Sequence, residues 1–206
     1  MSTIERRCVV VTGASGNLGA AVVSRLQRAG AGVAALTRKE ADLSDEAQVE
    51  AAYDKAMERY GALWASVHCA GGWAGGTVAK TPIDLLDKML EINLRSAFLC
   101  CRAALRRMRE GRIVNVAAIT AATFHGMAGA AAYNASKAAV IALTKSIADE
   151  GSGVRANCIA PGTLRTPANG NLPGQVPLED VAEAIFYLVS PDAGAVNGAV
   201  LTFPGR

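Results

Sequence analysis

Short apolar runs alternate with longer segments of helical periodicity along the whole chain. The apolar runs predict strands at 7–12, 32–36, 62–69, 113–118, 154–159 and 199–203. Apolar residues at three- and four-residue spacing predict helices at 17–29, 44–60, 81–111, 133–150 and 178–189. Strands that alternate with helices are typical of βαβ units, in which helices cover both faces of a parallel sheet. We therefore predict an α/β fold with a doubly wound parallel sheet, in a single three-layer α/β/α domain that spans residues 1–206.

The length and composition are those of one globular domain. With 206 residues, of which 51% are hydrophobic, the chain can bury the core of one domain. A net charge of +3 with 19% charged residues is too mild to favour nucleic-acid or membrane binding. The apolar run near the N-terminus is too short for a signal peptide or a membrane span. We expect a cytoplasmic protein.

The cysteines and histidines show no pattern of a metal or disulfide site. The five cysteines are an odd number, have no CxxC spacing and mostly lie in apolar runs. Neither His68 nor His125 stands at ligand spacing from a cysteine. We expect reduced thiols and no metal.

A glycine-rich segment, residues 12–19, joins the first predicted strand to the first predicted helix. It reads Thr-Gly-Ala-Ser-Gly-Asn-Leu-Gly. Glycines at this place let the backbone approach a pyrophosphate, whose charge the helix N-terminus attracts. A glycine triplet alone also fits an ordinary tight turn. The position between strand and helix favours a dinucleotide site, and with it a Rossmann fold.

Tyr133 and Lys137 are four residues apart at the start of a predicted helix, so their side chains project from the same face. A phenol has a pKa of about 10, and a neighbouring ammonium stabilises the phenolate and lowers that pKa. We therefore expect Lys137 to tune Tyr133 for the donation of a proton. Taken alone, this spacing is commonplace in surface helices.

The chain resembles the short-chain dehydrogenase/reductase family over nearly its whole length. The resemblance rests on several motifs in the family's order, which are jointly specific: residues 12–19, Asp42-Leu43, Cys69-Ala70-Gly71, Asn93, Tyr133 with Lys137, and Pro161-Gly162 followed by Thr166. This likeness implies an NAD(P)-dependent oxidoreductase. The cofactor-binding positions that it implies are Gly13, Ser15, Gly16, Asn17, Leu18, Gly19, Arg38, Asp42, Leu43, Ala70, Gly71, Tyr133, Lys137, Pro161, Gly162, Leu164 and Thr166.

Within that resemblance, Asp42 and Leu43 would flank the adenine and Lys137 would hold the nicotinamide ribose. Thr166 would bind the carboxamide of the nicotinamide. Asp42 is also well placed to be a turn or helix-capping acid beside Ser44. An acid after the second strand favours NAD, whereas cations accommodate the 2′-phosphate of NADP.

The segment after that strand offers Thr37, Arg38 and Lys39, so we expect NADP(H) to be favoured over NAD(H). The same two cations also fit a solvated turn.

The chain departs from the family pattern at two positions. Ala117-Ala118 stands where the family has a serine that orients the substrate oxygen, and Cys69 replaces an asparagine that steadies the central sheet. Thr120 could supply the missing hydroxyl, or it is an ordinary loop threonine. Asn93 matches the family's asparagine that anchors a water linked to the lysine. The expected catalytic residues are thus Tyr133, Lys137, Asn93 and Thr120.

We predict a reductase of a small carbonyl or quinonoid substrate. The chain also resembles dihydropteridine reductases, a branch of this family, in its alanine at the serine position, its short segment after the second strand and its compact length. A quinonoid imine is more electrophilic than a ketone and needs less help from a hydroxyl donor, so dihydropteridine reductase is one alternative. A catalytically impaired, cofactor-binding regulatory protein is another. The short 163–176 segment leaves an open pocket, and the helices at 81–111 and 133–150 are expected to pair in a homodimer or homotetramer.

Overall fold

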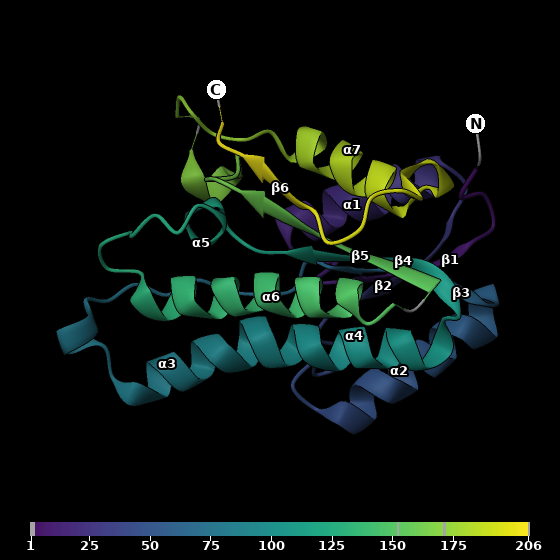
Figure 1. Ribbon diagram of the computed structural model, residues 1–206, viewed down its shortest axis with the longest axis horizontal. Coiled ribbons are helices and arrows are strands. Elements are labelled where there is room, and N and C mark those ends of the chain that lie inside the picture. Colours follow the sequence, from purple (N-terminus) through teal and green to yellow (C-terminus); the bar gives the residue numbers. More distant parts are fainter. Residues whose placement is uncertain (1–2, 152, 171, 206) are drawn as a thin grey trace.

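A six-stranded parallel sheet forms the centre of the molecule, whose computed structural model describes residues 3–151, 153–170 and 172–205 (Figure 1). The strand order is β2-β1-β3-β4-β5-β6. This doubly wound arrangement confirms the predicted α/β fold. The strands are β1 (Cys8–Thr12), β2 (Gly32–Leu36), β3 (Leu63–His68), β4 (Glu110–Val116), β5 (Gly153–Pro161) and β6 (Val200–Phe203).

Helices cover both faces of the sheet (Figure 1). On one face α1 (Asn17–Arg28) and α7 (Leu178–Val189) bury valine, leucine and isoleucine side chains against the strands. On the other face lie α2 (Glu46–Tyr60), α4 (Ser96–Arg107) and α6 (Ala131–Asp149). Within the described residues, no helix combines the length and the apolar character that a membrane span requires.

The predicted helix at 81–111 is wrong in two respects. It is divided into α3 (Ile83–Met89), a π-helical segment (Leu90–Arg95) and α4, and the last helix ends at Arg107. Strand β4 then begins at Glu110, because the polar residues Glu110 and Arg112 pair with β5 through their backbones. A short helix, α5 (Ile119–Ala122), follows β4 and was not predicted.

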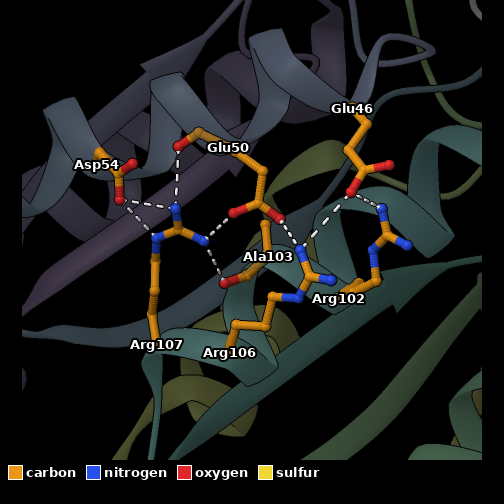
Figure 2. Close-up of polar contacts among 7 residues, drawn as sticks. All are labelled: Glu46, Glu50, Asp54, Arg102, Ala103, Arg106 and Arg107. Carbon is orange, nitrogen blue, oxygen red and sulfur yellow. Dashed lines mark hydrogen bonds and ion pairs between the residues drawn. The ribbon is translucent and has the colours of Figure 1, made fainter.

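Helix α2 is tied to α4 by ion pairs along their outer surface (Figure 2). Arg107 contacts two acids of α2: its Nη1 lies 2.5 Å from Glu50 Oε2 and its Nη2 lies 2.6 Å from Asp54 Oδ1. Arg106 Nη1 contacts Glu50 Oε1 at 2.9 Å. Burial raises the pKa of Glu50, but the bonds from Arg107 and Arg106 outweigh it and leave that pKa below its usual value.

We predict that Arg107→Leu lowers the free energy of unfolding by about 1–2 kcal/mol, because it leaves the half-buried Glu50 carboxylate short of a partner. The Arg107 side chain is 13% exposed, whereas that of Arg106 is 54% exposed. The matched control Arg106→Leu should therefore cost less than about 0.5 kcal/mol. Urea denaturation measures both, and equal losses would contradict the assignment.

Candidate active site

The glycine-rich turn after β1 is packed tightly against the loop that follows β3. Gly13 has φ +66°, and a Cβ there would lie 2.6 Å from the backbone nitrogen of Ala70. A Cβ on Gly19 would lie 2.2 Å from Gly13 O. These close approaches require glycine, because any side chain would collide with backbone.

The start of α1 suits a dinucleotide. The N-cap residue of the helix is Gly16, which has no side chain to bond the first backbone N–H groups. Ser15, Gly16 and Asn17 are exposed, whereas Leu18 and Gly19 are buried in the turn. A glycine-lined turn before a helix N-terminus is suited to a pyrophosphate, and the dinucleotide site at these residues stays a prediction.

The loop after β2 contains an acid that the sequence analysis missed. Glu40 Oε2 accepts hydrogen bonds from Thr37 N at 2.8 Å and from Thr37 Oγ1 at 2.5 Å. The bonds from Thr37 hold the pKa of Glu40 below its usual value. Its carboxylate therefore stands charged two residues beyond Arg38, which is itself exposed.

Asp42 is engaged as a turn acid, the alternative that the sequence left open. Its Oδ1 accepts from Ser44 N at 2.9 Å and from Ser44 Oγ at 2.8 Å. These bonds hold the pKa of Asp42 below its usual value. Asp45, rather than Ser44, is the N-cap of α2 and accepts from Gln48 N at 3.0 Å. Leu43 packs against the core.

The loop after β3 is bound to the π-helical segment through Asn93. The Asn93 side chain accepts from Gly72 N at 2.9 Å and donates to Gly72 O at 3.0 Å. Its Nδ2 also lies 3.0 Å from Ser136 Oγ, on the helix that holds Tyr133 and Lys137. Asn93 is 1% exposed, so it joins the two segments from inside the protein. The π-helical segment itself was missed, since nothing in its composition marks it.

Lys137 lies inside the protein beside this loop. The side chain is 6% exposed, and Nζ donates to the backbone carbonyl of Val116 at 2.9 Å. A Cβ on Gly71 would lie 3.1 Å from Nζ. Burial lowers the pKa of Lys137 to about 8. Strand β4, helix α6 and the Gly71 loop thus converge on one ammonium group.

Tyr133 occupies the first turn of α6, one turn before Lys137, and is partly buried. We expected the lysine to lower the pKa of the phenol. Instead burial raises the pKa of Tyr133. The cause is the loss of solvent around the phenolate, which favours the neutral phenol. In this structure Tyr133 is therefore a phenol that keeps its proton at neutral pH.

The hydroxyl expected to replace the missing serine is committed elsewhere. Ala118 is buried at the start of α5 and has no polar group to offer. Thr120, in α5, donates its proton to Asn134 Oδ1 at 2.7 Å. The prediction that Thr120 orients a substrate oxygen does not follow from this geometry, because its only proton is already used.

The loop after β5 lies at the same edge of the sheet. Pro161 ends β5, and Gly162 N donates to Phe203 O at 2.8 Å. Leu164 forms an isolated parallel bridge with Val176. Residue 171, which comes between them in the sequence, lies outside the described residues. Thr166 caps a 3₁₀ turn by accepting from Asn169 N at 3.3 Å, and its own hydroxyl proton is not used by that bond.

Aromatic residues stand exposed on loops that follow β3 and β4. Trp73 is 62% exposed and Phe124 is 89% exposed. Phe124 has φ +52°, which is unusual for a bulky residue. His125 is exposed beside it. Among the described residues, no three histidine, cysteine or acidic side chains gather as metal ligands would.

A comparison with protein families decides the classification. The family model described as enoyl-(acyl carrier protein) reductase matches residues 7–205. The chain belongs to the short-chain dehydrogenase/reductase family. It is therefore an NAD(P)-dependent oxidoreductase that acts on a small-molecule substrate.

Individual relatives of this short-chain dehydrogenase/reductase agree with the classification. The 2-(R)-hydroxypropyl-CoM dehydrogenase of Xanthobacter autotrophicus is 35% identical, with 97% of each chain covered. The 2-dehydro-3-deoxy-L-rhamnonate dehydrogenase (NAD(+)) of a Sphingomonas species is 36% identical, covering 81% of this chain and 76% of that one. A short-chain dehydrogenase from Burkholderia cenocepacia, solved with NADP, superposes with a TM-score of 0.90 at 29% identity and 98% coverage of each chain. Relatives thus use either nicotinamide cofactor.

We predict that Gly71→Ala destabilises the protein by about 1–3 kcal/mol, because it overfills a packed site. Its Cβ would lie 2.6 Å from Asn93 Oδ1, which is held by Gly72. Binding of NADPH should weaken in parallel. Gly126→Ala is the matched control, since nothing lies within 4 Å of its Cβ. Thermal unfolding and fluorescence titration measure both effects, and equal behaviour of the two variants would contradict the packing described here.

Proposed function

We propose that this short-chain dehydrogenase/reductase reduces a small carbonyl or quinonoid substrate with Tyr133 as the proton donor. The observation that carries the proposal is the buried Lys137 ammonium, fixed on the Val116 carbonyl one helical turn from Tyr133. A bound nicotinamide supplies the hydride. The proposed site lies at the carboxyl ends of the strands, where ligands bind in open parallel sheets.

The environment of Tyr133 suits a proton donor in the reductive direction. The phenol is protonated at neutral pH, as an unperturbed tyrosine is, and burial raises its pKa further, so it holds a proton for an oxygen or nitrogen that becomes negative. Lys137 keeps its charge below a pH of about 8. Its ammonium then stabilises the phenolate that remains after the proton has moved. Asn93 supports both residues indirectly, since it ties the Gly72 loop to Ser136 on α6.

We propose that the cofactor lies across the turn after β1 and the loops after β2, β3 and β5. The pyrophosphate would meet residues 13–19, and Ala70 and Gly71 would line the ribose beside Lys137. Pro161, Gly162, Leu164 and Thr166 would border the nicotinamide. Thr166 accepts its hydrogen bond from Asn169 N and gives no proton in it, which supports that role, as does the glycine N-cap of α1.

NADP(H) is proposed as the favoured cofactor over NAD(H). Arg38 and Lys39 are exposed after β2, where cations attract a 2′-phosphate. Glu40 offsets part of this charge, but Thr37 ties its carboxylate to the turn. Asp42 is likewise occupied by Ser44. Arg38 lies near Asp42 and Lys39 near Glu40, but both cations are exposed and can also meet a phosphate.

The absence of the family's serine narrows the class of substrate that we propose. With Ala118 in its place and the Thr120 proton given to Asn134, fewer donors are available to a ketone oxygen. A quinonoid imine needs less assistance, which keeps dihydropteridine reduction as an alternative, although the relatives named above lend it no support. A protein that binds the cofactor without turnover is the other alternative.

We further propose a homodimer or homotetramer in a reducing, cytoplasmic compartment. Ile83 is 74% exposed and Phe98 is 48% exposed, and they lie on α3 and α4. A groove of about 850 Å³, lined partly by Phe98 and Ile92, runs over the same surface.

The five cysteines are free thiols, four of them buried, and this supports the proposed reducing compartment.

Tyr133→Phe should lower the reduction rate by about 10²–10⁴-fold, the usual contribution of a positioned proton donor. The NADPH dissociation constant should change less than about threefold, because the ring is retained. NADPH oxidation is measured with four substrates: simple ketones, acetoacetyl thioesters, quinonoid dihydropterin, and the ketone that corresponds to 2-(R)-hydroxypropyl-CoM, the compound in the name of the Xanthobacter relative. Activity with dihydropterin alone selects that alternative. Unchanged NADPH oxidation in Tyr133→Phe contradicts the catalytic role and leaves a binding protein.

Arg38→Ala should weaken NADPH binding by about 10-fold or more while NADH binding changes little, because only NADPH has the phosphate. Lys55→Ala is the control, since Lys55 is exposed on α2 and the change in net charge is the same. Fluorescence titration with both cofactors gives the ratio. A cofactor preference that is the same in both variants would remove Arg38 from the site.

A further inference from the structure

His68 is the last residue of β3 and directly precedes the loop that meets Lys137. It is 3% exposed, and both of its ring nitrogens have hydrogen-bond partners. Nδ1 lies 2.7 Å from Asn115 Oδ1 on the neighbouring strand β4. Nε2 lies 2.8 Å from Ser66 Oγ and 3.3 Å from Tyr53 Oη, which reaches in from α2.

The direction of these hydrogen bonds is determined from one end. Thr144 donates its only hydroxyl proton to Val140 O at 2.8 Å, so its oxygen accepts from Asn115 Nδ2 at 2.9 Å. The amide of Asn115 is thereby oriented with Oδ1 toward His68. Because a carbonyl oxygen can only accept, the proton of the ring lies on Nδ1.

The other ring nitrogen then accepts. Of the two hydroxyls near Nε2, Ser66 Oγ is the closer at 2.8 Å, so we assign the donated proton to it. Its oxygen then accepts from Tyr53 Oη at 2.6 Å. Burial lowers the pKa of His68 to about 4, so the ring is neutral at physiological pH, as this chain of bonds requires. The titratable groups against the ring are Tyr53 and Cys101, whose Sγ lies 3.6 Å from Nδ1. The result is one ordered series of bonds that links α2, β3, β4 and α6.

Three members of this series, His68, Asn115 and Thr144, are linked along the chain to the proposed active site. Asn115 is followed by Val116, whose carbonyl receives the Lys137 ammonium. Thr144 lies seven residues after Lys137 on α6, so the two face the same side of the helix. His68 leads into residues 69–72, where a Cβ on Gly71 would lie 3.1 Å from Lys137 Nζ.

We propose that His68 is a positioning residue for the reaction: through Asn115 and Thr144 it fixes the end of β4 and helix α6, and thereby the place of the Lys137 ammonium. The inference rests on the proposed function, since it assigns to Lys137 a part in binding the cofactor and in the proton transfer. It requires a neutral His68 ring with its proton on Nδ1.

Three variants and one control test this role. His68→Leu removes both ring nitrogens at similar volume, whereas His68→Asn keeps a donor near the Nδ1 position. Thr144→Val removes the acceptor of Asn115 at the far end of the series and serves if His68→Leu does not fold. Trp64→Phe is the control: it removes a bond of 2.8 Å to Val189 O on the other face of the sheet.

We expect His68→Leu to lower kcat by about 10- to 100-fold, because a small displacement of a positioned group costs rate steeply. The substrate KM should stay within about threefold, and the NADPH dissociation constant should rise about fivefold. Thr144→Val should also lower kcat. The kcat of His68→Asn should lie within about threefold of that of the unmodified protein. Trp64→Phe should lose thermal stability but keep its kcat.

Nitrogen NMR of the protein at pH 7 reads the tautomer of His68 directly and does not depend on activity. A proton on Nε2, or a charged ring, would overturn the inference. So would a kcat and an NADPH dissociation constant that are alike in His68→Leu and Trp64→Phe. If the unmodified protein reduces no substrate, the reductase proposal fails. In that case a rise of the NADPH dissociation constant in His68→Leu, and not in Trp64→Phe, still supports the positioning role.

Discussion

The hydrogen bond from Lys137 Nζ to the Val116 carbonyl is the constraint on which the rest of the proposed site depends. An ammonium that is 6% exposed has given up most of its water and must be held by protein groups. That requirement brings the end of β4, the first turns of α6 and the Gly71 loop to one point. Asn93 joins the same loop to α6 from the other side. The site is therefore a meeting of three backbone segments around a single charge.

This arrangement also changes how the tyrosine is understood. From spacing alone, Lys137 should make Tyr133 more acidic, but in the structure desolvation dominates and the phenol stays protonated. A protonated phenol one helical turn from a buried ammonium suits reduction, in which a proton is donated. The alanine at 118 and the engaged Thr120 leave that phenol with little help from neighbouring hydroxyls. The proposed preference for an electrophilic substrate follows from these facts together.

The sequence was sufficient for the sheet and for most of the loops at its carboxyl edge. Buried strands such as β1 and β3 are continuous apolar runs, which are easy to recognise. The motifs at 12–19 and 69–71 come immediately after these strands in the sequence. The π-helical segment around Asn93 could not be predicted, because its backbone is set by contacts with Gly72 and Ser136. The engagement of Glu40 by Thr37, and of Thr120 by Asn134, depends on side-chain rotamers that spacing does not reveal. His68 looked unremarkable because its partner Asn115 is 47 residues away and becomes a neighbour only through the strand order.

The ionisation of Lys137 tests this account most directly. Carbon NMR of the protein labelled at lysine Cε, with the resonance of Lys137 assigned from its loss in Lys137→Met, follows the titration of that one ammonium. Burial of the ammonium predicts a pKa of about 8. A pKa near the ordinary value of 10.5 would show an ammonium in contact with water, and would contradict the buried, carbonyl-held lysine on which the proposed site is built.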